Sequence, residues 1–157
     1  MSEMLANHYF LSRNYQSALC EYENVLHKNS DNLLVKKRLI ICYIQNGLLS
    51  NALNLFIDLL RRDSNIFVKS NGYRDYCPCR DLIFEFENKQ TSGIDNYEVN
   101  LSLGILWFYC NANNSIEYFI QAEKLNPNQK KLNHVIRIIS DTILSIETNQ
   151  KNNLKRS

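Results

Sequence analysis

Cysteine and histidine are the side chains in this 157-residue chain best suited to hold a metal or exchange electrons. Cys77 and Cys79 flank one proline and form the only close pair of thiols. Structural zinc needs four Cys or His ligands, usually as two spaced pairs. The histidines lie far from this pair in sequence, at His8, His27 and His134. A redox pair usually has two residues between its cysteines rather than one. We therefore expect no metal and no cofactor, and interpret the motif as a turn that starts a helix and leaves both thiols partly exposed.

Acidic side chains give no better case for catalysis. The pairs Glu21 with Glu23 and Glu85 with Glu87 lie two residues apart. On a helix such residues point about 200° apart, so they cannot share one substrate proton. The chain has no Gly-rich phosphate loop, nucleophile elbow, paired helical histidines or Asp-rich calcium loop. We expect no catalytic residues and no enzyme activity.

The adjacent cations Lys37 and Arg38 are better suited to binding, because together they can pair with an acidic group. Over the whole chain, 18 basic and 16 acidic residues are interspersed. A nucleic-acid binder would cluster its basic residues on one face, so we expect no nucleic-acid partner. No apolar run is long enough to span a membrane, and the first residues lack the pattern of a signal peptide. We therefore expect a cytoplasmic protein without membrane insertion.

The elements that would position these residues are helices. Apolar residues recur three and four apart in blocks that cover residues 3–12, 15–28, 31–45 and 49–62. Only four Gly and two Pro occur, too few for the turns of a many-stranded sheet. Residues that suit helix starts are Asn14, Ser30, Asp95 and Asn114, and Gly47 suits a turn between helices.

The pattern repeats with a period of about 34 residues, a length typical of stacked helix pairs. Shifting the chain by this period superposes residues of like size: Leu5 on Leu39, Tyr9 on Tyr43, Ala18 on Ala52, Tyr22 on Phe56, Val25 on Leu59 and Ser30 on Ser64. A third unit follows the second at a longer interval, with Ser115, Phe119, Ala122 and Pro127 at the places of Ala52, Phe56, Leu59 and Ser64. Each unit is predicted to be a pair of helices.

The order of these residues resembles the tetratricopeptide repeat, a helix-turn-helix unit of about 34 residues. The resemblance implies an all-α, TPR-like helix-turn-helix repeat solenoid, or α-α superhelix, with about three repeats and a C-terminal capping helix. It predicts a single domain over residues 1–157 with these parts: repeat 1 at about 2–30, repeat 2 at about 31–64, an irregular insertion at 65–95, repeat 3 at about 96–127, a capping helix at 128–149 and a frayed basic tail at 150–157. The insertion is either a degenerate helix pair, which we favour, or a long functional loop.

In proteins of this family the first helix of each pair lines a concave groove that holds a peptide or helix of another protein. The family's groove positions correspond here to Asn7, Phe10, Leu11, Lys37, Arg38, Ile41, Gln45, Asn100, Leu101, Gly104, Trp107 and Phe108. Two of these assignments have alternatives. Gly104 takes the small position of the repeat if one residue is deleted from the turn, and Trp107 also falls on the apolar stripe of its helix.

The resemblance therefore predicts a protein–protein interaction module or scaffold. One subfamily clamps the C-terminal carboxylate of heat-shock chaperones, but here Glu3 and Arg38 replace a Lys and an Asn of that clamp, so we do not expect it. Two alternatives stay open. One is a chaperone for a secreted protein, similar to the type III secretion chaperones, and the other is a self-assembling structural repeat protein. A weak homodimer also remains open.

Overall fold

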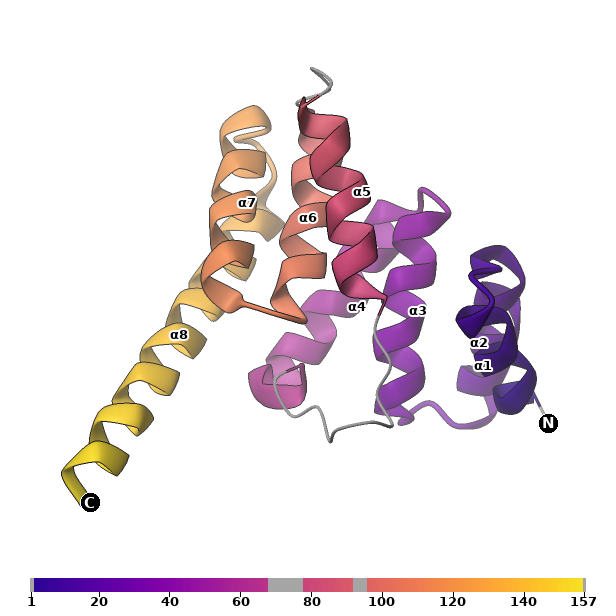
Figure 1. The fold of residues 1–157 in the computed structure, drawn as a ribbon, viewed down its shortest axis with the longest axis horizontal. Helices are drawn as coiled ribbons and strands as arrows, with labels where there is room; N and C mark the ends of the chain where they lie inside the picture. The colour runs from indigo at the N-terminus through magenta and orange to yellow at the C-terminus, as the bar shows by residue number, and fades with distance from the viewer. Residues whose placement is uncertain (1, 68–77, 92–95, 157) are drawn as a thin grey trace. The chain divides into compact units, whose positions relative to one another are not determined.

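The computed structural model describes residues 2–67, 78–91 and 96–156, and every regular element in these ranges is helical, which confirms the all-α prediction (Figure 1). The helices are α1 (Ser2–Leu11), α2 (Tyr15–Lys28), α3 (Leu33–Gln45), α4 (Leu49–Arg62), the short 3-10 helix η1 (Ser64–Ile66), α5 (Cys79–Thr91), α6 (Tyr97–Phe108), α7 (Ala112–Leu125) and α8 (Lys130–Arg156). The predictions for Cys77, for Asp95 and for much of the insertion lie outside the described residues.

The chain divides into two compact units, unit 1 (Met1–Asp58) and unit 2 (Leu59–Ser157). In unit 1, α1 packs on α2, and α2 packs on α3. In unit 2, α5, α6, α7 and α8 pack in chain order, each on the next, and η1 lies against α8.

Asparagine side chains start four of the helices. The oxygen of an N-cap Asn accepts a hydrogen bond from an amide of the first helical turn that would otherwise have no partner. The residues that do this are Asn14, Asn32, Asn96 and Asn111. Asn14 was predicted, whereas the predictions of Ser30 and Asn114 are wrong, because Asn32 and Asn111 cap those helices instead. In α7 the Asn111 oxygen accepts from the amides of both Asn113 and Asn114.

The small and aromatic residues of the three helix pairs are buried alike. The small residue of each pair is fully buried, and so is the aromatic residue one helical turn later. These residues are Ala18, Ala52 and Ser115, followed by Tyr22, Phe56 and Phe119. Small side chains allow two helices to approach closely, and the aromatic rings fill the space beside the contact. Other positions that the 34-residue period superposes differ in burial, since Leu5 is 42% exposed and Leu39 is buried.

Gly104 lies at the contact between α6 and α7. A methyl group added to its Cα would come within 3.0 Å of the Phe119 ring. The Ser115 hydroxyl donates a hydrogen bond to the Gly104 carbonyl oxygen in the same buried place. Gly104 thus lies where any larger side chain would meet the Phe119 ring.

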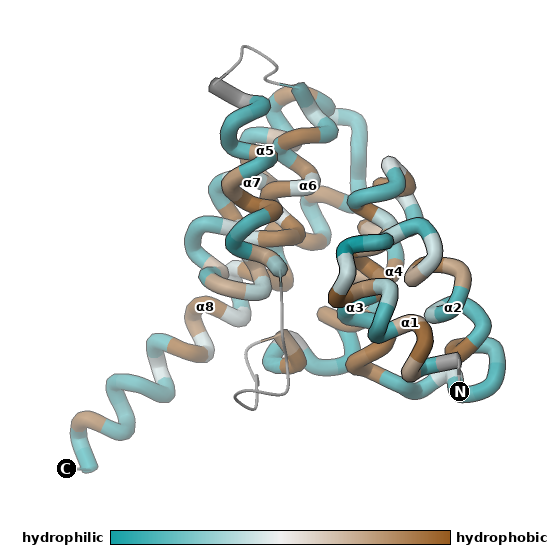
Figure 2. Tube along the Cα trace, turned by 45° about the vertical axis from the view of Figure 1, so that its right-hand side comes forward, coloured by the Kyte–Doolittle hydropathy of each residue, from teal (hydrophilic) through white to brown (hydrophobic). Residues whose placement is uncertain are grey.

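The last helix is longer than predicted. We expected a capping helix at 128–149 and a frayed tail, but α8 continues to Arg156. No Gly or Pro interrupts residues 147–156, Glu147 precedes Lys151 by one turn, and cations near the C-terminus suit the helix dipole. The final turns are mostly hydrophilic and extend beyond α7 (Figures 1 and 2).

The Cys77-Pro78-Cys79 motif does lead directly into a helix, because α5 begins at Cys79 and the Leu82 amide bonds the Pro78 carbonyl oxygen. The prediction of partly exposed thiols is wrong for Cys79, which is buried and disulfide-bonded. Leu82 and Ile83 of the same helix are also buried, so this end of α5 packs into unit 2.

Gly104→Ala tests the contact between α6 and α7. We expect it to lower the free energy of unfolding by about 1 to 2 kcal/mol, because overpacking costs about 1 to 3 and the helix propensity of Ala offsets up to about 1. Urea unfolding measures the change. Phe119→Leu makes room for the methyl group, so the double variant should lose less than the sum of the single losses. A more stable Gly104→Ala protein would contradict this packing.

Candidate functional site

Arg38 of α3 links α1, α2 and α3 at a point that we call the Arg38 cluster: Asn7, Phe10, Tyr22 and Arg38. Its Nη1 donates a hydrogen bond to Asn7 Oδ1 on α1, and the Tyr22 hydroxyl on α2 donates to the same oxygen at 2.7 Å. The guanidinium carbon lies 5.4 Å from the centre of the Phe10 ring. Asn7 and Phe10 were both predicted groove residues, and the structure brings them together with Arg38.

The guanidinium of Arg38 is buried without an anion. Its side chain is only 8% exposed, and Nε is enclosed without a hydrogen-bond partner. The described residues give it a neutral amide oxygen and an aromatic face, and no carboxylate. A buried charge without an ionic partner carries a large desolvation cost. The neutral partners of Arg38 offset only part of this cost.

Two neighbouring groups that could become anions stay neutral at ordinary pH, the Tyr22 phenol and the Cys42 thiol. Burial raises the pKa of the Tyr22 phenol to about 12, although the Arg38 guanidinium opposes the rise. Burial likewise raises the pKa of the Cys42 thiol to about 12. Glu3, one turn before Asn7 on α1, accepts a hydrogen bond from the Asn32 amide at 3.3 Å rather than from Arg38. Tyr22 and Cys42 therefore do not compensate the Arg38 charge.

The other predicted groove residues differ in exposure. In unit 1, Leu11 is 56% exposed and Gln45 half-buried, whereas Ile41 and Lys37 are buried. In unit 2, Asn100, Leu101 and Phe108 are buried. Two unit 2 side chains have defined partners. The Asn100 amide donates to the Asn96 carbonyl oxygen, and the Phe108 ring packs edge-on against Phe67 with centroids 5.3 Å apart.

Trp107 is half-buried, and its indole contacts an acidic residue, Glu87, that was not predicted as part of a site. Its Nε1 donates to Glu87 Oε1 on α5 at 3.3 Å, and the Tyr118 hydroxyl on α7 donates to the same oxygen at 3.1 Å. Burial and the hydrogen bond to Glu87 raise the pKa of Tyr118 to about 12. In the sequence Glu87 was considered only as half of the pair with Glu85, because donors on two later helices leave no local signal around it.

Comparisons with known proteins do not place the chain in a family. No protein-family model and no curated protein matches it. Within residues 2–67, 78–91 and 96–156, no three His, Cys, Asp or Glu side chains gather as they would around a metal ion. No helix in these ranges is both long and apolar enough to cross a membrane.

Stability should fall in alkali. In the folded chain the pKa values of Tyr22, Tyr43 and Tyr118 are raised to about 12. The unfolded chain releases these protons near pH 10, whereas the folded chain keeps them. The stabilisation is therefore complete below pH 10 and is lost progressively as pH rises towards 12. Urea unfolding at several pH values should show this fall, and Tyr22→Phe should make it shallower. A wild-type stability that stays constant from pH 10 to 12 would contradict the raised pKa values.

Arg38→Met should leave the free energy of unfolding unchanged or raise it by up to about 2 kcal/mol, because an apolar side chain of similar length removes the desolvation cost of a buried charge. Asn7 Oδ1 keeps its bond from Tyr22 in this variant. Urea unfolding of both proteins measures the difference. If Arg38 served only to hold α1 on α3, the same change would lower the free energy of unfolding by about 2 kcal/mol or more. This is the range expected for the loss of a hydrogen bond to a charged group.

Proposed function

We propose that the chain is a non-enzymatic, tetratricopeptide-like interaction module whose Arg38 cluster binds an acidic group on a peptide or helix of a partner protein. The observation that carries the proposal is the buried guanidinium of Arg38, which has neutral partners and an unbonded Nε. An acidic group of a partner would supply the missing anion.

The geometry of the guanidinium favours a carboxylate as that group. Nη1 is already bonded to Asn7, which leaves the edge formed by Nε and Nη2. Because Nε is enclosed in the free protein, side chains around this edge must move when the acidic group enters. This edge presents two parallel N–H groups, the arrangement that a carboxylate accepts with both oxygens. Lys37, the next residue on α3, carries a second positive charge. Leu11, near the end of α1, offers exposed apolar surface for the rest of the partner segment.

The repeat architecture is supported by the packing. Equivalent small and aromatic residues of the three helix pairs are fully buried, as expected when each pair packs in the same way. The alternatives of a secretion-type chaperone and of a self-assembling repeat protein remain hypotheses. Both would also act by binding protein surfaces.

Affinity capture from the source cell, with partners identified by mass spectrometry, tests the proposal. The wild type is compared with a Lys37→Glu, Arg38→Glu variant and with Lys36→Glu as a matched control on the same helix. Circular dichroism confirms that each variant is folded. We expect a partner that the wild type and the control retain and the double variant loses.

The captured partner's acidic segment is then titrated against the wild type and Arg38→Met. A charge-assisted hydrogen bond contributes about 1.5 to 3 kcal/mol, so binding should weaken at least tenfold. Equal retention of the partner by all variants would show that the Arg38 cluster is not the binding site.

A further inference from the structure

A pocket of about 460 Å³ opens in unit 2 between α5, the end of α6 and the residues that lead into α7. Its lining combines a cation, an acid, apolar rings, a thiol and an amide: Arg80, Ile83, Phe84, Glu87, Trp107, Cys110 and Asn111. All of these residues belong to one unit, and only Trp107 was among the predicted groove residues. The pocket is therefore separate from the Arg38 cluster.

The acidic residue of the pocket is already satisfied. Glu87 Oε1 accepts hydrogen bonds from Trp107 Nε1 and from the Tyr118 hydroxyl. These bonds also hold the indole in place as a wall of the pocket. A ligand need not bring a cation for Glu87.

The basic residue of the pocket has no partner within the described residues. Arg80 makes no hydrogen bond or ion pair to any of them. Burial raises the pKa of the nearby Cys110 thiol, and the Arg80 charge opposes the rise. The side-chain oxygen of Asn111 is committed to the amides of Asn113 and Asn114. The polar groups left for a ligand are thus donors, the Arg80 guanidinium and the Asn111 amide nitrogen.

The pocket walls beside Arg80 and Asn111 are apolar. Ile83 is buried, Trp107 is half-buried, and the Phe84 ring is 65% exposed at the rim. An exposed aromatic ring beside a half-buried indole is typical of a place where a partner's apolar side chain packs. A volume of 460 Å³ lies within the range of ligand-binding pockets.

We propose that this pocket binds a peptide segment in which a residue with a large apolar side chain is adjacent in sequence to a residue with a carboxylate. The apolar side chain packs between Phe84 and Trp107, and the carboxylate pairs with Arg80. One cation that has no partner in the described ranges, near the Glu87 carboxylate, matches a single negative charge, and the Glu87 charge would repel a polyphosphate.

The test uses two probe peptides, acetyl-Gly-Leu-Asp-amide and its neutral counterpart acetyl-Gly-Leu-Asn-amide. Trp107 is the only tryptophan, so its fluorescence reports on this pocket alone. We expect the Asp peptide to bind about tenfold more tightly than the Asn peptide, the gain of one charge-assisted hydrogen bond. Arg80→Gln should abolish this difference.

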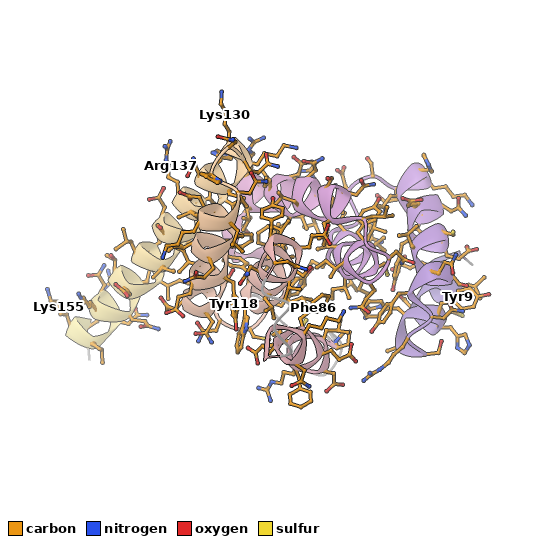
Figure 3. All side chains as sticks on the ribbon, turned by 90° about the horizontal axis from the view of Figure 1, so that it is seen from above. Tyr9, Phe86, Tyr118, Lys130, Arg137 and Lys155 are labelled. Carbon is orange, nitrogen blue, oxygen red and sulfur yellow. The ribbon has the colours of Figure 1, made fainter. Side chains whose placement is uncertain are left out.

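Arg137→Gln is the matched control, because Arg137 lies on α8, is exposed and projects away from the other helices of unit 2 (Figure 3). It should preserve the tenfold difference. Phe84→Ala should weaken both peptides equally, because it removes apolar contact without changing charge. Circular dichroism verifies the fold of each variant.

Cysteine alkylation gives a second readout. At saturating Asp peptide, iodoacetamide should modify Cys110 several-fold more slowly, whereas the exposed Cys20 of unit 1 should react at an unchanged rate. Equal binding of the two peptides, no response of Trp107, or a difference that survives Arg80→Gln would overturn the proposal. The Arg38 cluster lies in unit 1 and contains no tryptophan. If the proposed function of that cluster failed its test, the Trp107 fluorescence and the Cys110 alkylation rate would still report on this pocket.

Discussion

A single side-chain oxygen joins three helices in each unit. In unit 1, Asn7 Oδ1 on α1 accepts from Tyr22 on α2 and from Arg38 on α3. In unit 2, Glu87 Oε1 on α5 accepts from Trp107 on α6 and from Tyr118 on α7. Such a shared acceptor fixes the rotation of each helix about its axis, which apolar packing alone specifies less strictly. The candidate binding surfaces depend on these orientations.

The two junctions differ in the chemistry of the acceptor. The acceptor in unit 1 is a neutral amide, so no described residue compensates the Arg38 charge, and the proposed function assigns that role to an anion of a partner. The acceptor in unit 2 is the Glu87 carboxylate, which accepts from two neutral donors, while Arg80 lines the pocket beside apolar walls. Under the proposed function, stability and binding conflict at Arg38, as is common where a protein keeps a buried charge for function.

The helices were largely predictable from the sequence, because the spacing of apolar residues depends only on helix geometry. The small and aromatic positions followed from the repeat period. The helix starts were harder to predict, since Asn and Ser both cap well and a choice between nearby residues depends on loop geometry. The close contact at Gly104 needed the positions of Ser115 and Phe119. The Asn7–Arg38 and Glu87–Tyr118 contacts join residues far apart in the chain, so no local pattern could reveal them.

The most direct test of this account is the NMR signal of the Arg38 Nε–H group in the free protein, assigned by its loss in Arg38→Lys. The account predicts a signal without the downfield shift of a hydrogen-bonded group, and a downfield movement when acetate is added as the simplest carboxylate. A signal that is already downfield in the free protein and does not respond to acetate would show that Arg38 has an internal anion. It would then be a structural residue rather than a binding site.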